Sequence, residues 1–392
     1  MRGLMRRDCL KGLAAFSGGG VLWTLGAASI FRPSLPQPEG PVPAHVLALA
    51  EARVWPWEGG DRAEIELAHA QSAEWDLMAR LFLCFSLGDL VLRESDQRER
   101  WLRVWDTVLT DTIRKVSEEG ENTFLLPYVN RAPFQIQPQL SLFVSGELAL
   151  MLGLRRLFDG SDKWAGEHRR RIGQIAARLE QGPLLCAESY PDECWMFCNS
   201  VAVAALKVAD RVDGTNHADF VGRWVKVVQD KLTDPETGLL IGSFTLDGRR
   251  IDGVEGSSLW MTTHQLRLVD PEFAKAQYEG ARAALGRSLL GFGYALEWPE
   301  SQKGREDIDS GPVVPGLEAS TSSSGLAILA AASFSDERWL GELLAALEFA
   351  AIPEETEGRR RYKASNLMGD SVLLAGLTCG PLWRLAGAEE VG

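Results

Sequence analysis

The feature that most constrains the fold of this chain is a succession of helical apolar patterns that run in pairs from residue 63 to residue 385. Apolar residues recur at helical spacing in eleven segments, which are 63–94, 98–116, 138–158, 162–179, 192–212, 217–232, 257–269, 271–290, 321–332, 337–350 and 366–385. Strand patterns are few: a hairpin over 239–251 that turns at Asp247-Gly248, and short extensions at 294–298 and 360–363.

About a dozen helices in antiparallel pairs predict an all-α protein, namely an (α/α)6 six-hairpin barrel with a few short strands. In such a toroid the inner helices and the loops at one end line a central cavity. An α-solenoid is the alternative architecture, although no repeat recurs at a fixed period. We expect a single domain over 44–392, because no later stretch of the chain has the composition of a linker.

Residues 1–31 have the character of a targeting segment. Residues 6–11 (Arg-Arg-Asp-Cys-Leu-Lys) resemble the twin-arginine export motif, and an apolar run rich in glycine and alanine follows over 13–31. Five prolines then fall within 33–43, so 32–43 is expected to be a linker. We therefore expect a periplasmic or exported protein. A membrane anchor through the same residues is the first alternative, and an ordinary N-terminal helix is the second.

Composition excludes several classes of function. The net charge is −13, which disfavours a nucleic-acid partner because such a protein needs a basic face. Phosphate-binding loops, a Gly-x-Ser-x-Gly elbow and an HExxH motif are all missing from the sequence, so no cofactor and no metal are expected. The expected partner is a small-molecule substrate. Oligomeric state is open, a homo-oligomer included.

The stretch 186–199 concentrates chemically active residues. It holds Cys186, Cys194 and Cys198, which are three of the six cysteines, together with three acids and three aromatics. The cysteines lack further ligands at zinc spacing, so we interpret Cys186 or Cys198 as an acid/base group or nucleophile beside a pocket. Cys194, nearest the start of the predicted helix 192–212, would be the more acidic thiol.

Asp192 has two interpretations of equal weight. Ser189-Tyr190-Pro191-Asp192-Glu193 has the form of a helix start, with serine as the cap and acids in the first turn. Asp192 is then a capping acid, but it is also well placed to act in a pocket. Tyr190 and Phe197 are expected to contact the substrate.

Glu147 lies within the apolar segment 140–154. A carboxylate there is costly unless it has a partner or faces a cavity, and burial would raise its pKa and suit it to general acid catalysis. The alternative is an acid on the outer surface of the helix.

Two further acidic segments are candidates for the rim of the pocket. Asp307 and Asp309 lie in the compact loop 305–312, which follows Trp298. Glu255 precedes the predicted helix 257–269 and is either a substrate-binding acid or a helix cap. A solvated turn is the alternative for the loop.

The chain resembles the linalool dehydratase/isomerase family over about 140–240. The similar residues run from Cys186 through Tyr190-Pro191-Asp192 to Phe197-Cys198-Asn199, and upstream they include Ser145-Gly146-Glu147-Leu148. Glu147 stands where that family has a catalytic histidine, and Cys186 and Cys198 are further apart than the family's paired cysteines. The resemblance implies an exported six-hairpin barrel, with a role for Cys198 and, less directly, for Cys186.

Three functions follow as hypotheses. The first is a cofactor-independent enzyme that dehydrates, hydrates or isomerises a small apolar, terpenoid-like alcohol, with Glu147 or Asp192 as the acid and Cys198 or Cys186 as the base. The second is a carbohydrate-active hydrolase or lyase that uses two carboxylates from this chain. The third is a binding or scaffold protein of the cell envelope that lacks catalytic activity.

Overall fold

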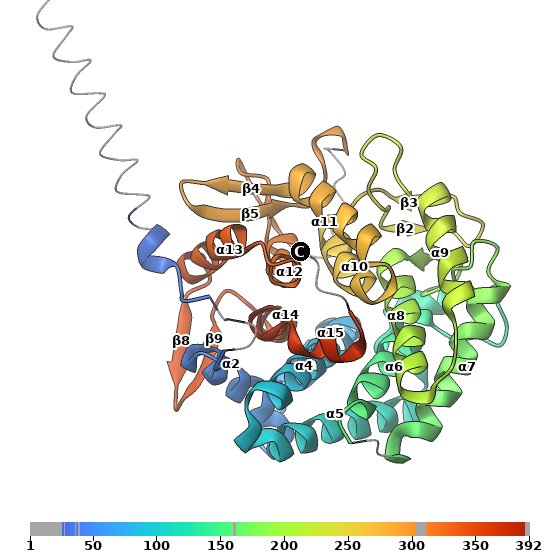
Figure 1. Cartoon of the computed structure of the whole chain (residues 1–392), viewed down its shortest axis with the longest axis horizontal. Coiled ribbons are helices and arrows are strands. Elements are labelled where there is room, and N and C mark those ends of the chain that lie inside the picture. Colours follow the sequence, from blue (N-terminus) through green and yellow to red (C-terminus); the bar gives the residue numbers. More distant parts are fainter. Residues whose placement is uncertain are drawn as a thin grey trace, which may run out of the picture.

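Six helices form a closed inner ring. The computed structural model describes residues 26, 28–35, 37, 40–159, 162–302 and 311–388. Each inner helix contacts the next one, and the last contacts the first, so the ring closes (Figure 1). Its members in order are α4 (Ala73–Arg93), α6 (Leu142–Arg156), α8 (Met196–Asp213), α10 (Gly256–Val269), α12 (Thr321–Ser333) and α14 (Leu367–Thr378).

A second layer of helices surrounds the ring. α5 packs on α4 and α6, α7 on α6 and α8, α11 on α10, α13 on α12, and α2 on α14, while α9 lies outside α8 (Figure 1). The outer helices are α2 (Ala44–Val54), α5 (Arg98–Glu119), α7 (Ala165–Gln181), α9 (Ala218–Lys231), α11 (Pro271–Leu285) and α13 (Glu337–Ala350). The molecule is therefore an (α/α)6 barrel, as predicted, and its closed ring excludes the α-solenoid.

Sequence composition explains which helices are inside. Every residue of α6 is buried, because a helix that is apolar nearly all round must be covered on all sides. α7 and α9 carry apolar residues on one side only, and they bury that side against the ring while charged residues face outward. Burial of apolar surface on both sides of each inner helix is the main stabilising contribution to the barrel.

The remaining elements are short. Two further helices are α3 (Ala63–Gln71) and α15 (Pro381–Ala386). The strands form three small antiparallel sheets, which are β1–β2–β3 (Cys194–Trp195, Ser243–Phe244, Arg250–Asp252), β4–β5–β7–β6 (Gly286–Leu289, Phe292–Leu296, Ala319–Ser320, Val313–Val314) and β8–β9 (Pro353–Thr356, Arg359–Tyr362). The hairpin predicted at Asp247-Gly248 is confirmed between β2 and β3, where Gly248 has a φ of 92°.

Several predicted helices are shorter than their apolar patterns. The pattern over 63–94 divides into α3 and α4 at Ser72, whose extended backbone interrupts the helix. The pattern over 271–290 ends at Leu285, because the next four residues pair with β5 as strand β4. Within the described residues, no helix is both long and apolar enough to cross a membrane.

The two ends of the ring differ in what covers them. Acids and a thiol near the starts of α4, α6 and α8 gather at one end. At the other end α15 contacts α4, where the Leu382 amide donates to Asp89 Oδ1 at 2.7 Å. The Trp383 indole donates to the carbonyl of His264 in α10, so α15 spans two inner helices and covers this end.

Candidate functional site

The turn that precedes α8 is built around a buried carboxylate. Glu188 is fully buried and accepts hydrogen bonds from the backbone amides of Gln135, Ile136 and Asp192 at 2.8–2.9 Å. Arg178 lies 3.8 Å from its second oxygen. These contacts fix the loop that leads into the site, and they occupy Glu188 as a structural group.

The predicted helix start at Ser189 is wrong, because α8 begins only at Met196. Residues 194–195 form strand β1, in which Cys194 pairs with Phe244 of β2. Cys194 and Cys198 therefore do not share a helix face. Asp192 adopts a left-handed φ of 56°, and its carboxylate accepts the Leu246 amide at 3.1 Å. Asp192 thus joins this turn to the β2–β3 hairpin.

Glu147 lies in α6 and is fully buried. Neither of its carboxylate oxygens has a hydrogen-bond partner among the described residues. Burial raises the pKa of this carboxyl well above 4.5, and the negative charge of Glu74 raises it further. Burial therefore favours the protonated form of Glu147, which can donate its proton to a bound hydroxyl group.

Cys198 lies in the first turn of α8 and is buried. Burial raises the pKa of its thiol well above 9.0, and the Ser189 hydroxyl beside it acts in the opposite direction. The negative charge of Glu74 raises the pKa again, as would the charge of Glu147 if that carboxyl were ionised. The Cys198 thiol is therefore within electrostatic range of both carboxyl groups. The raised pKa also shows that the thiol is protonated at neutral pH, so it is a weak base in its resting state.

Glu74, at the start of α4, accepts a hydrogen bond from the Tyr190 hydroxyl at 2.5 Å. The same hydroxyl accepts the Leu126 amide at 2.8 Å, which holds its proton toward Glu74. The Tyr190 ring is stacked on Tyr128, with centroids 4.3 Å apart. Tyr190 is thus held on all sides, and burial together with the charge of Glu74 raises its pKa.

Glu193 forms a third acidic corner of the site. Its Oε1 accepts hydrogen bonds from the Tyr128 hydroxyl at 3.0 Å and from the Trp195 indole at 2.5 Å. The charge of Glu193 also acts on the pKa of Cys198. The site therefore combines three glutamates, two tyrosines and one thiol at the end of the ring where α4, α6 and α8 begin.

The other two clustered cysteines are also protonated thiols held by other contacts. The Cys186 thiol is in contact with Trp224 of the outer helix α9, and burial raises its pKa to about 12. Burial also raises the pKa of Cys194, and the neighbouring Cys186, Cys198, Glu188 and Asp192 act in the same direction. All cysteines in the described part of the chain are free thiols.

The remaining predicted residues are placed as follows. Phe197 is buried next to Cys198 in α8, and Trp298 is half-buried just after β5. Glu255 is the residue before α10, half-buried, with its carboxylate close to Gly242. Asp307 and Asp309 lie outside the described residues. Over 40–159, 162–302 and 311–388, no group of three His, Cys, Asp or Glu side chains is arranged to hold a metal ion.

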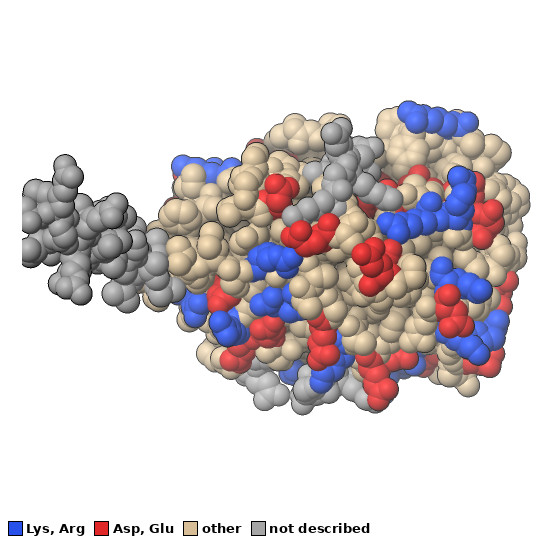
Figure 2. Space-filling model, turned by 90° about the horizontal axis from the view of Figure 1, so that it is seen from above, with Lys and Arg blue, Asp and Glu red and all other residues tan. Residues whose placement is uncertain are grey.

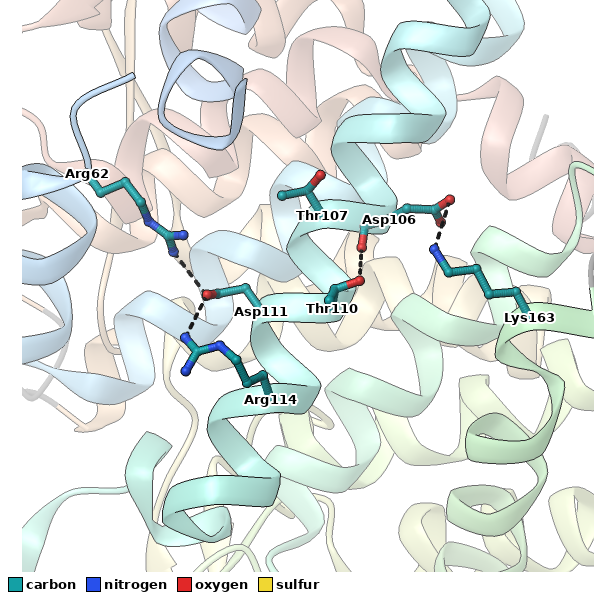
Figure 3. A pocket seen from close by; sticks show the side chains of 7 residues that line it. All are labelled: Arg62, Asp106, Thr107, Thr110, Asp111, Arg114 and Lys163. Atoms are coloured by element: carbon teal, nitrogen blue, oxygen red, sulfur yellow. Dashed lines mark hydrogen bonds and ion pairs between the residues drawn. The ribbon is translucent and has the colours of Figure 1, made fainter. Parts of the chain in front are cut away.

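Two hollows on the outer surface are lined by other residues. One of about 340 Å³ lies along α5, where Arg62 and Arg114 both bind Asp111 and Lys163 lies 3.5 Å from Asp106 (Figure 3). A second, of about 410 Å³, is lined by Arg169, Ile172, Gly173, Ala176, Ala209, Asp213, Thr215 and His217. Each charged group drawn in the first hollow already takes part in an ion pair, and neither hollow includes a residue of the site.

Sequence reasoning missed Glu74, Tyr128, Glu193 as a site residue, and Ser189 as a neighbour of Cys198. Glu74 belongs to an ordinary amphipathic pattern, and Tyr128 lies in a loop, so neither position carries a local signal. Glu193 was assigned to a helix cap together with Asp192. Only the packing of α4 against α6 in the ring brings Glu74 into electrostatic range of Glu147.

The chain is similar to proteins of known family and fold. The family model described as linalool dehydratase/isomerase matches residues 145–368. A family 105 glycoside hydrolase from C. acetobutylicum ATCC 824 matches with a TM-score of 0.52 at 11% identity, over 86% of this chain and 99% of that one. A polysaccharide lyase matches with a TM-score of 0.51 at 9% identity, over 86% and 96% of the two chains. At such identities the two structures show a shared fold alone.

Proposed function

Because this chain belongs to the linalool dehydratase/isomerase family, we propose that it is an enzyme that dehydrates, hydrates or isomerises a small, largely apolar alcohol without a cofactor. The observation that carries this proposal is the Glu147 carboxyl group. It is fully buried, it has no hydrogen-bond partner among the described residues, and its pKa is raised. A hydroxyl group of a substrate would supply the missing hydrogen bond and receive the proton.

The proposed dehydration uses an acid and a base from neighbouring inner helices. Glu147 transfers its proton to the hydroxyl oxygen, the carbon–oxygen bond breaks, and water leaves with the electron pair of that bond. Glu74 then accepts a proton from the adjacent carbon, and the electrons of that carbon–hydrogen bond form the new double bond. Hydration is the reverse sequence. Isomerisation follows if water returns to a different carbon of the same intermediate.

Glu74 is a better base for this step than the Cys198 thiol. The negative charge of Glu74 raises the pKa of Glu147, and the Glu74 carboxylate accepts a hydrogen bond from the Tyr190 hydroxyl at 2.5 Å. The thiol would first have to lose a proton that burial retains. We assign Cys198 to the apolar wall beside the reacting carbons, with a weak hydrogen bond to the leaving oxygen.

Aromatic rings in the site suit a carbon centre that becomes positive as the water leaves. Tyr128 and Tyr190 are stacked, and Phe197 is adjacent to Cys198 in the chain. The face of an aromatic ring attracts a cation and, unlike water or a thiolate, does not form a bond with it. These rings would stabilise the developing charge until Glu74 removes the proton.

The test is oxygen exchange in Glu147→Gln. A panel of terpene alcohols is incubated with the protein in water enriched in ¹⁸O, and alcohol labelling and alkene formation are followed by mass spectrometry. Loss of the acid should lower both rates by about 100-fold or more. Asp89→Asn is the matched control, because it removes a buried carboxyl of α4 at the opposite end of the ring. Equal rates in Glu147→Gln and the wild type would overturn the proposal.

A second function is favoured by the pair Glu74 and Glu147. Glycoside hydrolysis requires one protonated and one ionised carboxyl group, and the two charge states assigned here have that form. Oligosaccharides therefore belong in the same screen. Release of reducing sugar that is lost in both Glu74→Gln and Glu147→Gln, with no alcohol turned over, would favour this second function.

A further inference from the structure

Exposed apolar side chains gather on one part of the outer surface. We define the apolar patch as Ile30, Leu289, Leu290, Phe349 and Ile352, whose exposed fractions are 81%, 48%, 38%, 61% and 56%. Eleven large apolar side chains are exposed in the described residues, and these five come from only three chain segments. A concentration of this kind on a protein surface indicates a binding face.

Contacts between the three segments make the patch continuous. The Phe31 ring packs edge-on against Phe349 at the end of α13, with centroids 5.3 Å apart. Phe292, which pairs with Leu289 in the β4–β5 hairpin, lies 5.4 Å from the same Phe349 ring. Ala28 lies against Gly291 at the tip of the hairpin. The patch is thus where residues 28–31, the β4–β5 tip and the end of α13 meet (Figure 1).

The apolar run of the N-terminus ends within this patch. Residues 28–31 are helical, and they are the last four residues of the apolar run 13–31. The proline-rich segment follows this contact, so no flexible linker separates the run from the folded domain at this point. Arg32 follows directly and is exposed, which suits a residue at the level of lipid head groups.

We propose that the apolar patch lies on the surface of the bilayer into which the apolar run inserts, so that the barrel is held in one orientation on the membrane. If the run enters a bilayer, residues 28–31 bring the β4–β5 tip and the end of α13 to its surface. The side chains of the patch then enter the head-group region and lose contact with water.

The contact is apolar and not electrostatic. The chain carries a net charge of −13, which opposes attraction to anionic lipids. Acidic and basic residues alternate over the face seen in Figure 2, and the surface next to the N-terminal residues is mostly uncharged. Binding through the apolar patch should therefore persist at high salt, whereas a contact made by basic residues would weaken.

The experiment uses the full chain, reconstituted in nanodiscs of phosphatidylethanolamine with a minor share of phosphatidylglycerol. An environment-sensitive dye is attached at Leu290→Cys in a Cys9→Ala background, and lipids that carry a quencher at the head-group level are added. The control is Asp219→Cys, whose side chain is 94% exposed in α9, on the other side of the ring. We expect quenching several-fold stronger at position 290 than at position 219, and equally strong in high salt.

A second variant tests whether the quenching at position 290 depends on the apolar patch. Phe349→Ser with Ile352→Ser removes two exposed side chains and should return quenching at position 290 close to the control level, while near-ultraviolet circular dichroism confirms folding. Equal quenching at positions 290 and 219 would overturn the proposal. So would protection at position 290 that appears only when two copies associate, because a second copy would then cover the patch. Quenching that disappears in high salt would overturn the apolar contact.

Discussion

The role of acid proposed for Glu147 depends on the groups that its surroundings lack. Apolar residues of α6 surround it, no described group donates a hydrogen bond to it, and its pKa is raised by burial and by the charge of Glu74. The sequence identified Glu147 by the cost of a carboxyl in an apolar helix, which is a local property. It could not identify Glu74, because their proximity depends on two helices that are far apart in the chain.

Tyr190→Phe tests how Glu74, the proposed base, is positioned. The substitution keeps the stacking on Tyr128 but removes the hydroxyl that donates to Glu74 and accepts from Leu126. We expect a loss of about 1–3 kcal/mol in the free energy of unfolding, because the half-buried Leu126 amide loses its partner. Turnover should fall as well, since Glu74 loses the hydrogen bond from Tyr190.

Tyr128→Phe is the matched control for that measurement. Its hydroxyl donates to the Glu193 carboxylate, and its removal leaves the hydrogen bond between the Leu126 amide and Tyr190 in place. Urea denaturation of both variants should show the larger change for Tyr190→Phe. A larger change for Tyr128→Phe would contradict the positioning role assigned to Tyr190.

At the scale of elements, the apolar patterns located the helices well but misplaced some of their ends. The helix cap expected at Ser189 is a turn followed by strand β1, because Cys194 and Trp195 pair with β2 about fifty residues later. A pairing between such distant segments cannot be predicted from a short stretch of sequence. By contrast, the cap of α12 lies within its own segment, since the Ser320 hydroxyl accepts the Ser323 amide.

Substitutions of Asp192 test whether its carboxylate has a structural or a catalytic role. Its left-handed φ of 56° suits Asn as well as Asp, and an Asn side-chain oxygen could still accept the Leu246 amide. Asp192→Asn should therefore retain turnover and change stability by less than about 0.5 kcal/mol. Asp192→Ala loses the hydrogen bond and strains the turn, at a cost of about 1–3 kcal/mol measured by urea denaturation. Abolished turnover in a well-folded Asp192→Asn would instead favour a catalytic role.

For the whole molecule, the repeated pairing of apolar and amphipathic segments was sufficient to predict the (α/α)6 barrel. Inner and outer helices alternate along the chain, so the order of the segments already specifies the ring. The pattern does not predict which elements cover the two ends of the ring. At the end covered by α15, the Asp89 carboxylate accepts the Leu382 amide and the His264 carbonyl accepts the Trp383 indole. Neither contact can be predicted from the periodicity of the sequence.

Asp89 should make the stability of the molecule depend on pH. Burial raises its pKa from 3.8 to about 8, so the folded state retains a proton that the unfolded state loses. Stability from this group is present below about pH 4 and is lost as the pH rises through about 8, by at most about 1.4 kcal/mol per pH unit. Thermal unfolding of Asp89→Asn should therefore vary less with pH over this range than the wild type.

Asp370 provides an internal comparison for that measurement. Burial raises its pKa only to about 6, so Asp370→Asn should reduce the pH dependence over the narrower range from about 4 to 6. If Asp89→Asn unfolds with the same pH dependence as the wild type between pH 6 and 8, Asp89 is ionised in the folded state and its assignment is wrong.

The contact between Asp89 and Leu382 joins residues 293 positions apart, and α14 must meet α4 before the ring can close. A chain that leaves the ribosome from its N-terminus cannot make either contact until nearly all of its codons have been read. Until then, the helices that are synthesised first keep one apolar side exposed to solvent, which makes the chain prone to aggregation and proteolysis. Folding of this protein is therefore expected to be largely post-translational, and a chain that stops short of α15 should depend on chaperones far more than the complete one.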